Sequence, residues 1–478
     1  MAIEWSGLSP GLLVRLDRSA GQPLRAQLEG SVREAIRDGR LRGGERLPSS
    51  RELARELGVS RGMVQECYGQ LLAEGYLTSR TGSATRVADI RERQAAASPR
   101  TPSPARQAPD RALIADFRAG VPDLASFPRN DWAWAVRQAC GEIASADLGY
   151  GDPRGSAVLR EVLAGYLRRV RAADADPRQM IISTGFAQGL NLVLRVLSRE
   201  SGVSSVAFED PGYGSAQSDE TVRAVAAMGL RAEYVPVDEE GLVVSALAAS
   251  GAQAVVVTPA HQSPTGVVLS AARRHALVAW AQRTDGYVIE DDYDSEFRYD
   301  KEPVGALQGL APDQVFLVGT ASKALAPAVR LGWVHAPSAL AEAVAAEKEM
   351  SDRGSCALDQ FALATLLTSG RYDRHLRRMR AVYARRRAAL VDAFARYSSE
   401  VRLTGLAAGF HAVAPLPAGA EEAAVITAAR ERRVGLYGIG DYRGRPDAAA
   451  PPALVIGFGN VRERAIDPAI AAVAGLFS

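Results

Sequence analysis

The chain has 478 residues, of which 47% are hydrophobic and 23% are charged, and its formal net charge is +2. Such a length predicts more than one domain, and such a composition is ordinary for globular proteins. No apolar run approaches the roughly 18 residues that span a bilayer, and the N-terminus lacks the pattern of a signal peptide. Cys67, Cys140 and Cys356 lie far apart, without metal-ligand spacing. We therefore expect a cytoplasmic protein that has no membrane segment, structural metal or disulfide framework.

Lysine is unusually scarce in this chain. Only three of the 57 basic residues are lysines, namely Lys301, Lys323 and Lys348. Arginine stays charged, so it cannot replace lysine where chemistry needs a deprotonated amine. Each of the three lysines is therefore a candidate for such chemistry.

A linker divides the chain. Residues 91–110 contain four prolines and no apolar side chain larger than Ala or Pro, so they cannot form a buried core. We place the linker at 89–111, an N-terminal domain at 1–88 and a second domain at 112–478. Within the second domain, a smaller α+β part is expected from about residue 341.

The N-terminal domain has the pattern of a winged helix-turn-helix. Apolar residues recur at helical spacing from Leu24 to about Asp38. Ser49 or Ser50 can cap a second helix that Gly58 ends, and Ser60 can cap a third. The stretch 75–87 fits two short strands around a Gly-containing turn, which would form the wing.

The first turn of the third helix is the candidate DNA-reading element, because such a turn can face base edges in the major groove. Arg51 would grip a phosphate, and the tip of the wing would lie along the DNA backbone or minor groove. Residues 1–90 hold thirteen arginines and eleven acids, so the pattern alone also allows a helix-turn-helix used only for packing. The candidate DNA-contacting residues are Arg51, Ser60, Arg61, Met63, Gln65, Thr81 and Gly82.

The segment GGERLPSSRELARELGVSRGMVQECYGQLLAEGYLTSRTGSATRV resembles the winged helix-turn-helix of the GntR family over nearly its whole length. The resemblance implies that the protein binds a double-stranded DNA operator. It also implies that Arg51, Arg61, Gln65 and Gly82 occupy DNA-contacting positions.

After the linker, short β-branched runs alternate with helical patterns. This alternation predicts an α/β fold, in which helices cover both faces of a largely parallel sheet. The expected helices include 187–198 and 271–283. The expected strands are 180–184, 206–209, 232–237, 254–258, 287–290, 315–318 and, near the C-terminus, 453–458.

Polar residues follow several of these strands, where ligands of such sheets gather. Lys323 lies just after one strand, with hydroxyls and Arg330 nearby in the sequence, which suits an amine beside a phosphate. Asp291 follows another strand, and the Thr184–Ala187 joint leads into a helix whose free amides can bind phosphate. Taken one by one, these residues are also consistent with a solvated lysine, a capping aspartate and an ordinary helix start.

The motifs DFRAGVPD, LGYGDPRG, ISTGFAQGL, FEDPGYGSA, VVTPAHQSPTG, VIEDDYDSEFRY and VGTASKALAPAVRLGW resemble fold-type I aminotransferases. They are most similar to the variant that is fused to GntR domains, the MocR-type regulators. The resemblance implies that Lys323 holds pyridoxal 5′-phosphate (PLP) as an internal aldimine and that Asp291 pairs with the pyridine nitrogen. The other implied contacts are Tyr293 near the ring hydroxyl, Tyr213 stacked on the ring, and Phe186, Ala187, Thr320, Ser322 and Arg330 at the phosphate. Tyr150 matches a tyrosine that reaches the phosphate of a partner subunit, which implies a homodimer.

Three positions depart from the aminotransferase pattern. Ser263 occupies the place of an asparagine that contacts the ring hydroxyl. Val455 stands where amino-acid aminotransferases carry the arginine that binds the substrate carboxylate, and Ser215 stands where some amino-acid-sensing relatives carry an arginine. A bidentate arginine–carboxylate pair orients a substrate strongly. We therefore expect partial or slow transamination at most.

The preferred interpretation is a PLP-dependent transcription regulator that senses PLP or a small amine and controls vitamin B6 metabolism. One alternative is an active aminotransferase with an appended DNA-binding domain. Another is a DNA-binding protein whose second domain has lost its cofactor and only dimerises. A visible absorption band that disappears in Lys323→Ala would exclude this last alternative.

Overall fold

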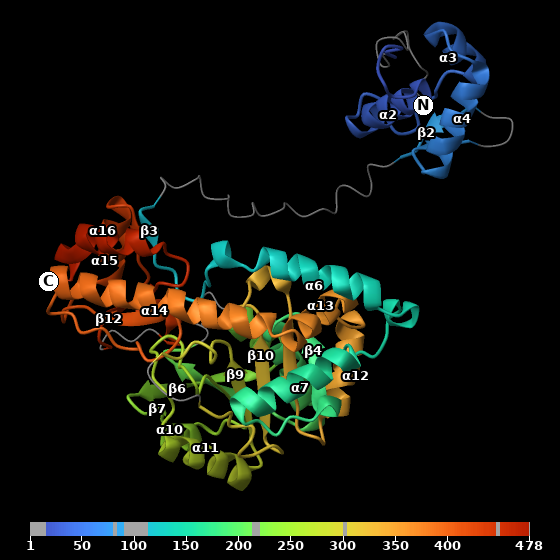
Figure 1. The fold of residues 1–478 in the computed structure, drawn as a ribbon. Helices are drawn as coiled ribbons and strands as arrows, with labels where there is room; N and C mark the ends of the chain where they lie inside the picture. Colours follow the sequence, from blue (N-terminus) through green and yellow to red (C-terminus); the bar gives the residue numbers. More distant parts are fainter. Residues whose placement is uncertain are drawn as a thin grey trace. The chain divides into compact units, whose positions relative to one another are not determined.

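The computed structural model describes residues 16–79, 84–89, 113–212, 220–299, 304–445 and 450–477. The chain forms two compact units, Met1–Ala108 and Pro109–Ser478 (Figure 1). Nearly all of the expected linker lies outside the described residues. Within the described part, no helix is both long enough and apolar enough to cross a membrane.

In its described residues the N-terminal unit has three helices and a two-stranded wing. Its elements are α2 (Leu24–Arg37), α3 (Ser50–Leu57), α4 (Arg61–Ala73), β1 (Leu77–Thr78) and β2 (Arg86–Val87). Ser49 forms a capping box with Glu52 at the start of α3, and Gly58 ends that helix in the left-handed conformation. The hydroxyl of Ser60 accepts a hydrogen bond from the amide of Met63 at the start of α4. The predicted caps and the antiparallel strands of the wing are thus confirmed.

The core of this unit joins all of its elements. Leu28 and Val32 of α2 pack with Val64 and Leu71 of α4, and Val87 closes the core from the wing. The residues that recur at helical spacing in α2, namely Leu28, Val32, Ala35 and Ile36, are all buried. This packing fixes α4 and leaves its first turn at the surface.

The C-terminal unit contains an eight-stranded sheet in the order β4-β11-β10-β9-β8-β5-β6-β7. The five strands from β10 to β6 run parallel. β11 is antiparallel to both of its neighbours, so β4 runs in the same direction as β10. The bounds of the eight strands are β4 (Met180–Ser183), β5 (Ser205–Asp210), β6 (Arg231–Asp238), β7 (Gly241–Leu242), β8 (Ala254–Val257), β9 (Tyr287–Asp292), β10 (Val315–Thr320) and β11 (Gly332–His335).

Helices cover both faces of the sheet, because alternate residues of each strand point to opposite sides. Ala254 and Val256 of β8 pack in a cluster with α8 and α12. Val255 and Val257 of the same strand pack with α10 and α11. The helices of this part are α6 (Arg129–Glu142), α7 (Ala157–Arg171), α8 (Phe186–Glu200), α9 (Glu220–Ala227), α10 (Val244–Ser250), α11 (Ala271–Thr284), α12 (Ala341–Asp352) and α13 (Ala357–Thr368).

A smaller α+β part completes the unit. The long helix α14 (Arg371–Tyr397) runs from α13 towards α15 (Glu422–Glu431) and α16 (Glu463–Val473), as Figure 1 shows. β12 (His411–Pro415) pairs antiparallel with β14 (Ala453–Gly457). β13 (Val434–Gly435) pairs parallel with β3 (Ala115–Asp116). The first strand of the unit therefore belongs to the smaller α+β part.

The structure confirms the predicted parallel strands and adds features that the sequence pattern did not reveal. β11 lies antiparallel inside the sheet, where a run of four residues after Leu331 gave no separate signal. β9 extends to Asp292, so Asp291 is the fifth residue of the strand and does not follow it. α12 packs against α8 and β4, although it begins at the residue where the smaller part was expected to start.

Candidate functional site

The carboxyl ends of the parallel strands meet at one edge of the sheet, and the predicted cofactor residues gather there. β9 and β10 are neighbours, with Asp291 paired in register with Val318. Lys323 follows β10, and the Thr184–Ala187 joint follows β4, which runs in the same direction. Ligands of such sheets bind at this edge. The fold therefore brings Thr184 and Lys323, which are 139 positions apart in the sequence, to the same edge of the sheet.

Lys323 lies half-buried under the segment that contains Gly120. Its Nζ donates a hydrogen bond to the carbonyl oxygen of Gly120 over 2.7 Å. Burial lowers the pKa of Lys323, and the charge of Asp291 opposes this shift. Burial thus favours the neutral amine, which is the nucleophilic form.

Asp291 provides a carboxylate that the described residues leave unsatisfied. The side chain is 3% exposed, and its buried Oδ1 has no hydrogen-bond partner in the described part of the chain. Burial, and next the charge of Asp292, raise the pKa of Asp291 well above its ordinary value, whereas Lys323 lowers it. A buried acceptor without a partner is costly. This atom fits a cationic or N–H donor from a bound group, such as a protonated pyridine nitrogen.

The start of α8 contains the segment that is predicted to bind the phosphate, here called the phosphate cradle. Gly185 precedes α8 with φ 114°, and a Cβ placed on it would lie 3.5 Å from the guanidinium of Arg330. Gly332 approaches so closely that an added Cβ would lie 2.7 Å from the Cα of Gly185. The first turn of α8, at Phe186 and Ala187, therefore lies beside the Arg330 cation, and a helix N-terminus next to a cation suits an anion.

Thr320 and Ser322 lie in the turn that leads from β10 to Lys323. The Thr320 hydroxyl donates to the Ser322 hydroxyl over 2.8 Å, and it accepts a hydrogen bond from the Ser322 amide. Thr320 pairs with Gly332, which lies two residues after Arg330. This turn therefore holds both hydroxyls close to the start of β11. The predicted phosphate contacts are thus assembled around one helix start.

Tyr293 joins a buried polar cluster that the sequence did not reveal. Its hydroxyl donates to the carbonyl of His261 over 2.9 Å. His261 Nδ1 lies 2.8 Å from Asp294, and the His261 and His411 ring centroids are 4.7 Å apart. Burial, and next His261, lower the pKa of His411. The cluster connects the ends of β8 and β9 with the first residue of β12, and so holds Tyr293 between the larger and smaller parts.

Ser263 is held by a second buried network, which joins the ends of β5 and β8. Glu209 accepts hydrogen bonds from the amide and the hydroxyl of Thr258 at 3.1 and 2.6 Å. Gln262 Nε2 donates to the carbonyl of Pro211 at 2.9 Å, and the amide of Ser263 donates to Thr258 Oγ1. Burial raises the pKa of Glu209 to about 7. The sequence contained these residues within two quoted motifs, but their pairing depends on strand neighbours.

Val455 lies at the other side of the site and faces an apolar cluster. It is fully buried and packs with Val413 and Ile439, while Ala119 and Tyr442 border the same cluster. Ala119 precedes Gly120, whose carbonyl receives Lys323. Position 455 therefore offers no cation to the carboxylate of a substrate.

The described residues do not place two of the predicted cofactor contacts, Tyr213 and Tyr150, in this assembly. Tyr213 and Ser215 lie outside the described residues. Tyr150 is 79% exposed, and the guanidinium of Arg353 lies 5.5 Å from its ring centroid. Within the described part of its own subunit, the Tyr150 ring therefore contacts Arg353.

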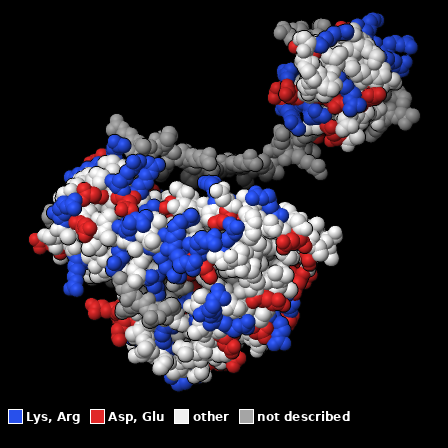
Figure 2. All heavy atoms as spheres, viewed as in Figure 1, with Lys and Arg blue, Asp and Glu red and all other residues white. Residues whose placement is uncertain are grey.

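The candidate DNA face lies on α3 and α4. Arg51, Arg61 and Gln65 are exposed, and neither arginine has an ion-pair partner among the described residues. Met63 is half-buried and packs on the domain core, so less of it is available to DNA. Thr81 and Gly82 lie outside the described residues. Figure 2 shows positive and negative side chains intermingled on the visible face of this unit, in keeping with its nearly balanced charge.

The N-terminal unit is a winged helix-turn-helix. The C-terminal unit has a sheet with an amine, an unsatisfied carboxylate and an anion cradle at one edge. These features define a DNA-binding regulator with an aminotransferase-like domain. The family model for bacterial regulatory proteins of the gntR family matches residues 24–87, and that for aminotransferase class I and II matches residues 116–437.

Known proteins support the same class. The chain is 34% identical to the HTH-type pyridoxine biosynthesis transcriptional regulator PdxR of Corynebacterium glutamicum, over 91% of each chain. It is 33% identical to the probable rhizopine catabolism regulatory protein MocR of Rhizobium meliloti, over 79% of this chain and 78% of the relative. An archaeal alanine:glyoxylate aminotransferase has a similar fold, with a TM-score of 0.68 and 25% identity over 77% of this chain and 91% of that one.

The chain belongs to the MocR-type regulators of the GntR family, and it is an HTH-type transcription regulator. The predicted family and the predicted fold class are thereby confirmed.

Proposed function

We propose that this regulator binds PLP at Lys323 and changes its affinity for an operator when PLP, or a small amine bound through it, occupies the site. The observation that carries the proposal is the unsatisfied Asp291 Oδ1 in a site that also holds the half-buried Lys323. PLP, when bound, supplies an aldehyde that condenses with primary amines. Lys323 would hold it covalently, Asp291 would accept the ring N–H, and the start of α8 with Arg330 would bind the phosphate.

We propose control of vitamin B6 metabolism as the output. Pyridoxine biosynthesis is the process that the name of the Corynebacterium glutamicum relative states. The apolar cluster at Val455 favours the vitamin as effector over an ordinary amino acid, because it lacks the guanidinium that would orient a carboxylate.

The proposal includes a division of labour along the chain. Residues 1–88 would bind DNA through Arg51, Ser60, Arg61, Gln65 and, in part, Met63 and the wing. Residues 89–111 would link this domain to the PLP-binding and dimerising domain at 112–478. The regulator would act in the cytoplasm as a homodimer, in which Tyr150 completes the site of the other subunit.

An operator-binding experiment tests the proposal directly. Bound DNA is selected from the host genome, and its affinity is then measured with and without PLP at fixed salt, because DNA affinity depends strongly on salt. We expect PLP to change the operator affinity of the wild type and not that of Lys323→Ala. If a candidate amine changes the affinity and PLP alone does not, the version in which PLP is the effector is wrong.

DNA binding itself is tested with a matched pair of arginines. Arg61→Ala should weaken operator binding by about 10- to 100-fold, the range for loss of a charged contact. Arg25→Ala serves as the control, since Arg25 is paired with Glu29 and Glu66. Equal effects of both substitutions would contradict the placement of α4 in the groove.

The second candidate function is an active aminotransferase, which the assembled Lys323 and Asp291 favour. Steady turnover of an amino donor with a 2-oxo acid would support it. A single spectral change on amine addition, without turnover, would support sensing.

A further inference from the structure

Lys348 is a scarce lysine that the proposed function does not use. Its side chain is fully buried, and its Nζ lies 2.6 and 2.7 Å from the two carboxylate oxygens of Asp352, one turn further along α12. A buried ion pair of this kind is costly to break, because either partner alone would remain as an unpaired charge. The pair therefore fixes the end of α12.

Asp352 connects this end of α12 to the phosphate cradle of the same subunit. It accepts a hydrogen bond from Gln188 Nε2 at 2.6 Å and another from the amide of Gly354 at 3.0 Å. Gln188 lies in the first turn of α8, and its Oε1 accepts from the amide of Thr184 at 2.8 Å. The loop after α12 thus has a fixed position beside the cradle.

Arg353 is held at the tip of this loop in an unusual backbone conformation. Its φ is +61°, which L-residues other than glycine and asparagine adopt at a cost. Arg353 is the C-cap of α12, and its amide donates a hydrogen bond to the carbonyl of Glu349, which holds this conformation. Arg353 is exposed, and no carboxylate pairs with it among the described residues. Its guanidinium is therefore available to a ligand or partner.

Arg353 and Tyr150 are exposed neighbours, and Leu148 and Met350, two and three positions away from them in the sequence, are exposed too; these four residues are here called the Tyr150 surface. The three apolar or aromatic residues are 62%, 79% and 84% exposed. Arg353 lies over the Tyr150 ring, and an added Cβ on Gly354 would lie 3.8 Å from the Tyr150 carbonyl. Exposed patches rich in Tyr, Met and Arg are typical of protein interfaces.

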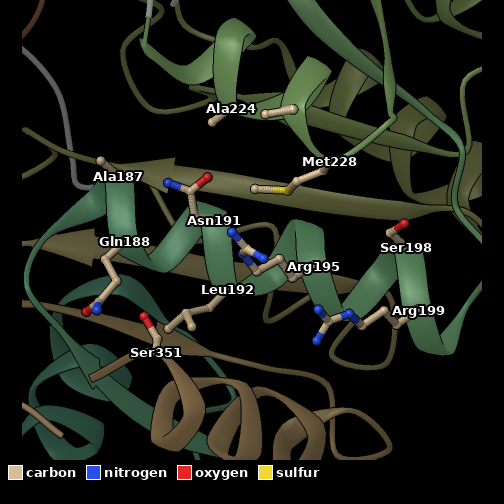
Figure 3. A pocket seen from close by; sticks show the side chains of 11 residues that line it. Ala187, Gln188, Asn191, Leu192, Arg195, Ser198, Arg199, Ala224, Met228 and Ser351 are labelled. Atoms are coloured by element: carbon tan, nitrogen blue, oxygen red, sulfur yellow. The ribbon is translucent and has the colours of Figure 1, made fainter. Parts of the chain in front are cut away.

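The molecule is hollowed beside the same elements. A cavity of about 680 Å³ lies between α8, α9 and α12 and is lined by Gln188, Asn191, Arg195, Met228 and Ser351, among others (Figure 3). In the figure, Gln188 and Ser351 lie at the α12 side of this hollow. Ser351 directly precedes Asp352, so the hollow borders the anchored loop.

We propose that Arg353 of each subunit enters the PLP site of a second copy of the chain, together with Tyr150, and binds an anionic group there. The proposal rests on the proposed function, in which Tyr150 crosses to the other subunit. A twofold dimer uses the same surface of both subunits. Because Arg353 contacts the Tyr150 ring, Arg353 reaches the other subunit wherever Tyr150 does. The anion is either the phosphate of PLP or the carboxylate of a bound amino acid, for which Val455 provides no cation.

Two reciprocal heterodimers test whether Arg353 acts on the other subunit. The substitution is Arg353→Asn, because asparagine tolerates the positive φ. Heterodimer one combines a Lys323→Ala subunit with an Arg353→Asn subunit. Heterodimer two combines a wild-type subunit with a subunit that carries both substitutions. Each holds one intact Lys323, and differently tagged chains allow each to be purified as a full-length dimer.

Binding is measured from the visible absorption of the bound cofactor. For a phosphate contact, heterodimer one should bind PLP like the wild type at half the sites, whereas heterodimer two should bind it about 10- to 100-fold more weakly. The Arg353→Asn homodimer should also be weakened towards PLP and not towards pyridoxal, and Arg353→Lys should recover part of the affinity. Arg374→Asn removes another exposed arginine and should have no effect.

For a carboxylate contact, PLP affinity stays unchanged in every variant, and the spectral response to L-alanine is weakened by the same factor in heterodimer two. The response to ethylamine is then unaffected. The proposal is overturned if the two heterodimers behave alike towards PLP and L-alanine, or if heterodimer one is the weaker. A wild-type chain that fails to dimerise or to bind PLP would instead contradict the proposed function.

Discussion

The two sides of the candidate PLP site are built from opposite chemistry. On one side, Lys323, Asp291 and the start of α8 provide an amine, an unsatisfied carboxylate and an anion cradle. On the other, Val455 packs in an apolar cluster with Val413. An aminotransferase needs both a cofactor holder and a group that orients its substrate. The difference supports the proposal that this site holds its cofactor for sensing.

The largest effect is expected from removing the amine. Lys323→Ala should abolish the visible absorption of bound PLP, because the other described residues of the site offer no amine in its place. Lys301→Ala serves as a lysine control and should retain the absorption. If Lys323→Ala kept the wild-type absorption and affinity, the cofactor side of the comparison would be misassigned.

The next effect comes from converting the apolar side. Val455→Arg should increase the spectral response to L-alanine relative to ethylamine by about 10- to 100-fold, because a guanidinium gains a charged contact with the carboxylate. The same change should lower the melting temperature without ligand, since it buries an unpaired charge. Val455→Met is the neutral control and should do neither. An unchanged preference in Val455→Arg would show that position 455 does not face the bound amine.

A smaller effect is expected from neutralising the unsatisfied carboxylate. Asp291→Asn should weaken PLP binding by about tenfold, within the range for a charged hydrogen bond. It should also raise the melting temperature of the PLP-free protein at neutral pH, because the buried Asp291 carboxyl must either take up a proton or stay charged without a partner at Oδ1, and asparagine avoids both costs. Titration by absorption and differential scanning calorimetry measure the two effects. A loss of stability in both forms would contradict the assignment of Oδ1 to the cofactor.

The last effect concerns the pH dependence of stability and leaves both sides of the site in place. Burial raises the pKa of Glu209 to about 7, so its contribution to stability is complete below its ordinary pKa of 4.5 and is lost as the pH rises through 7. Glu209→Gln should remove a pH-dependent loss on the order of 3 kcal/mol between pH 4.5 and 8. Melting temperatures of the PLP-free protein at pH 5 and 8 measure it.

A control separates Glu209 from other carboxylates. Burial also raises the pKa of Glu290 to about 7, so part of the dependence should remain in Glu209→Gln. Glu239→Gln changes an exposed glutamate and should retain the full dependence. A Glu209→Gln protein that also retains it would show that the native state does not hold Glu209 protonated above its ordinary pKa.

Local signals predicted much of the fold. The caps at Ser49 and Ser60 and the inner face of α2 depend on residues within one or two helical turns, so the sequence sufficed to place them. β11 escaped prediction because a short buried strand has no periodicity of its own. The His261–Asp294 contact and the Glu209–Thr258 contact join residues 33 and 49 positions apart, and only the neighbours within the sheet reveal them.

The sequence by itself determined the family, the strand–helix alternation and which residue types could hold PLP, because these properties depend on local pattern and side-chain chemistry. It also singled out Lys348 by scarcity alone. Only the tertiary structure decided that Asp291 Oδ1 lacks a partner, that Val455 faces an apolar cluster and that Lys348 anchors the loop of Arg353. These properties arise from burial and from contacts between distant segments, which no local pattern encodes.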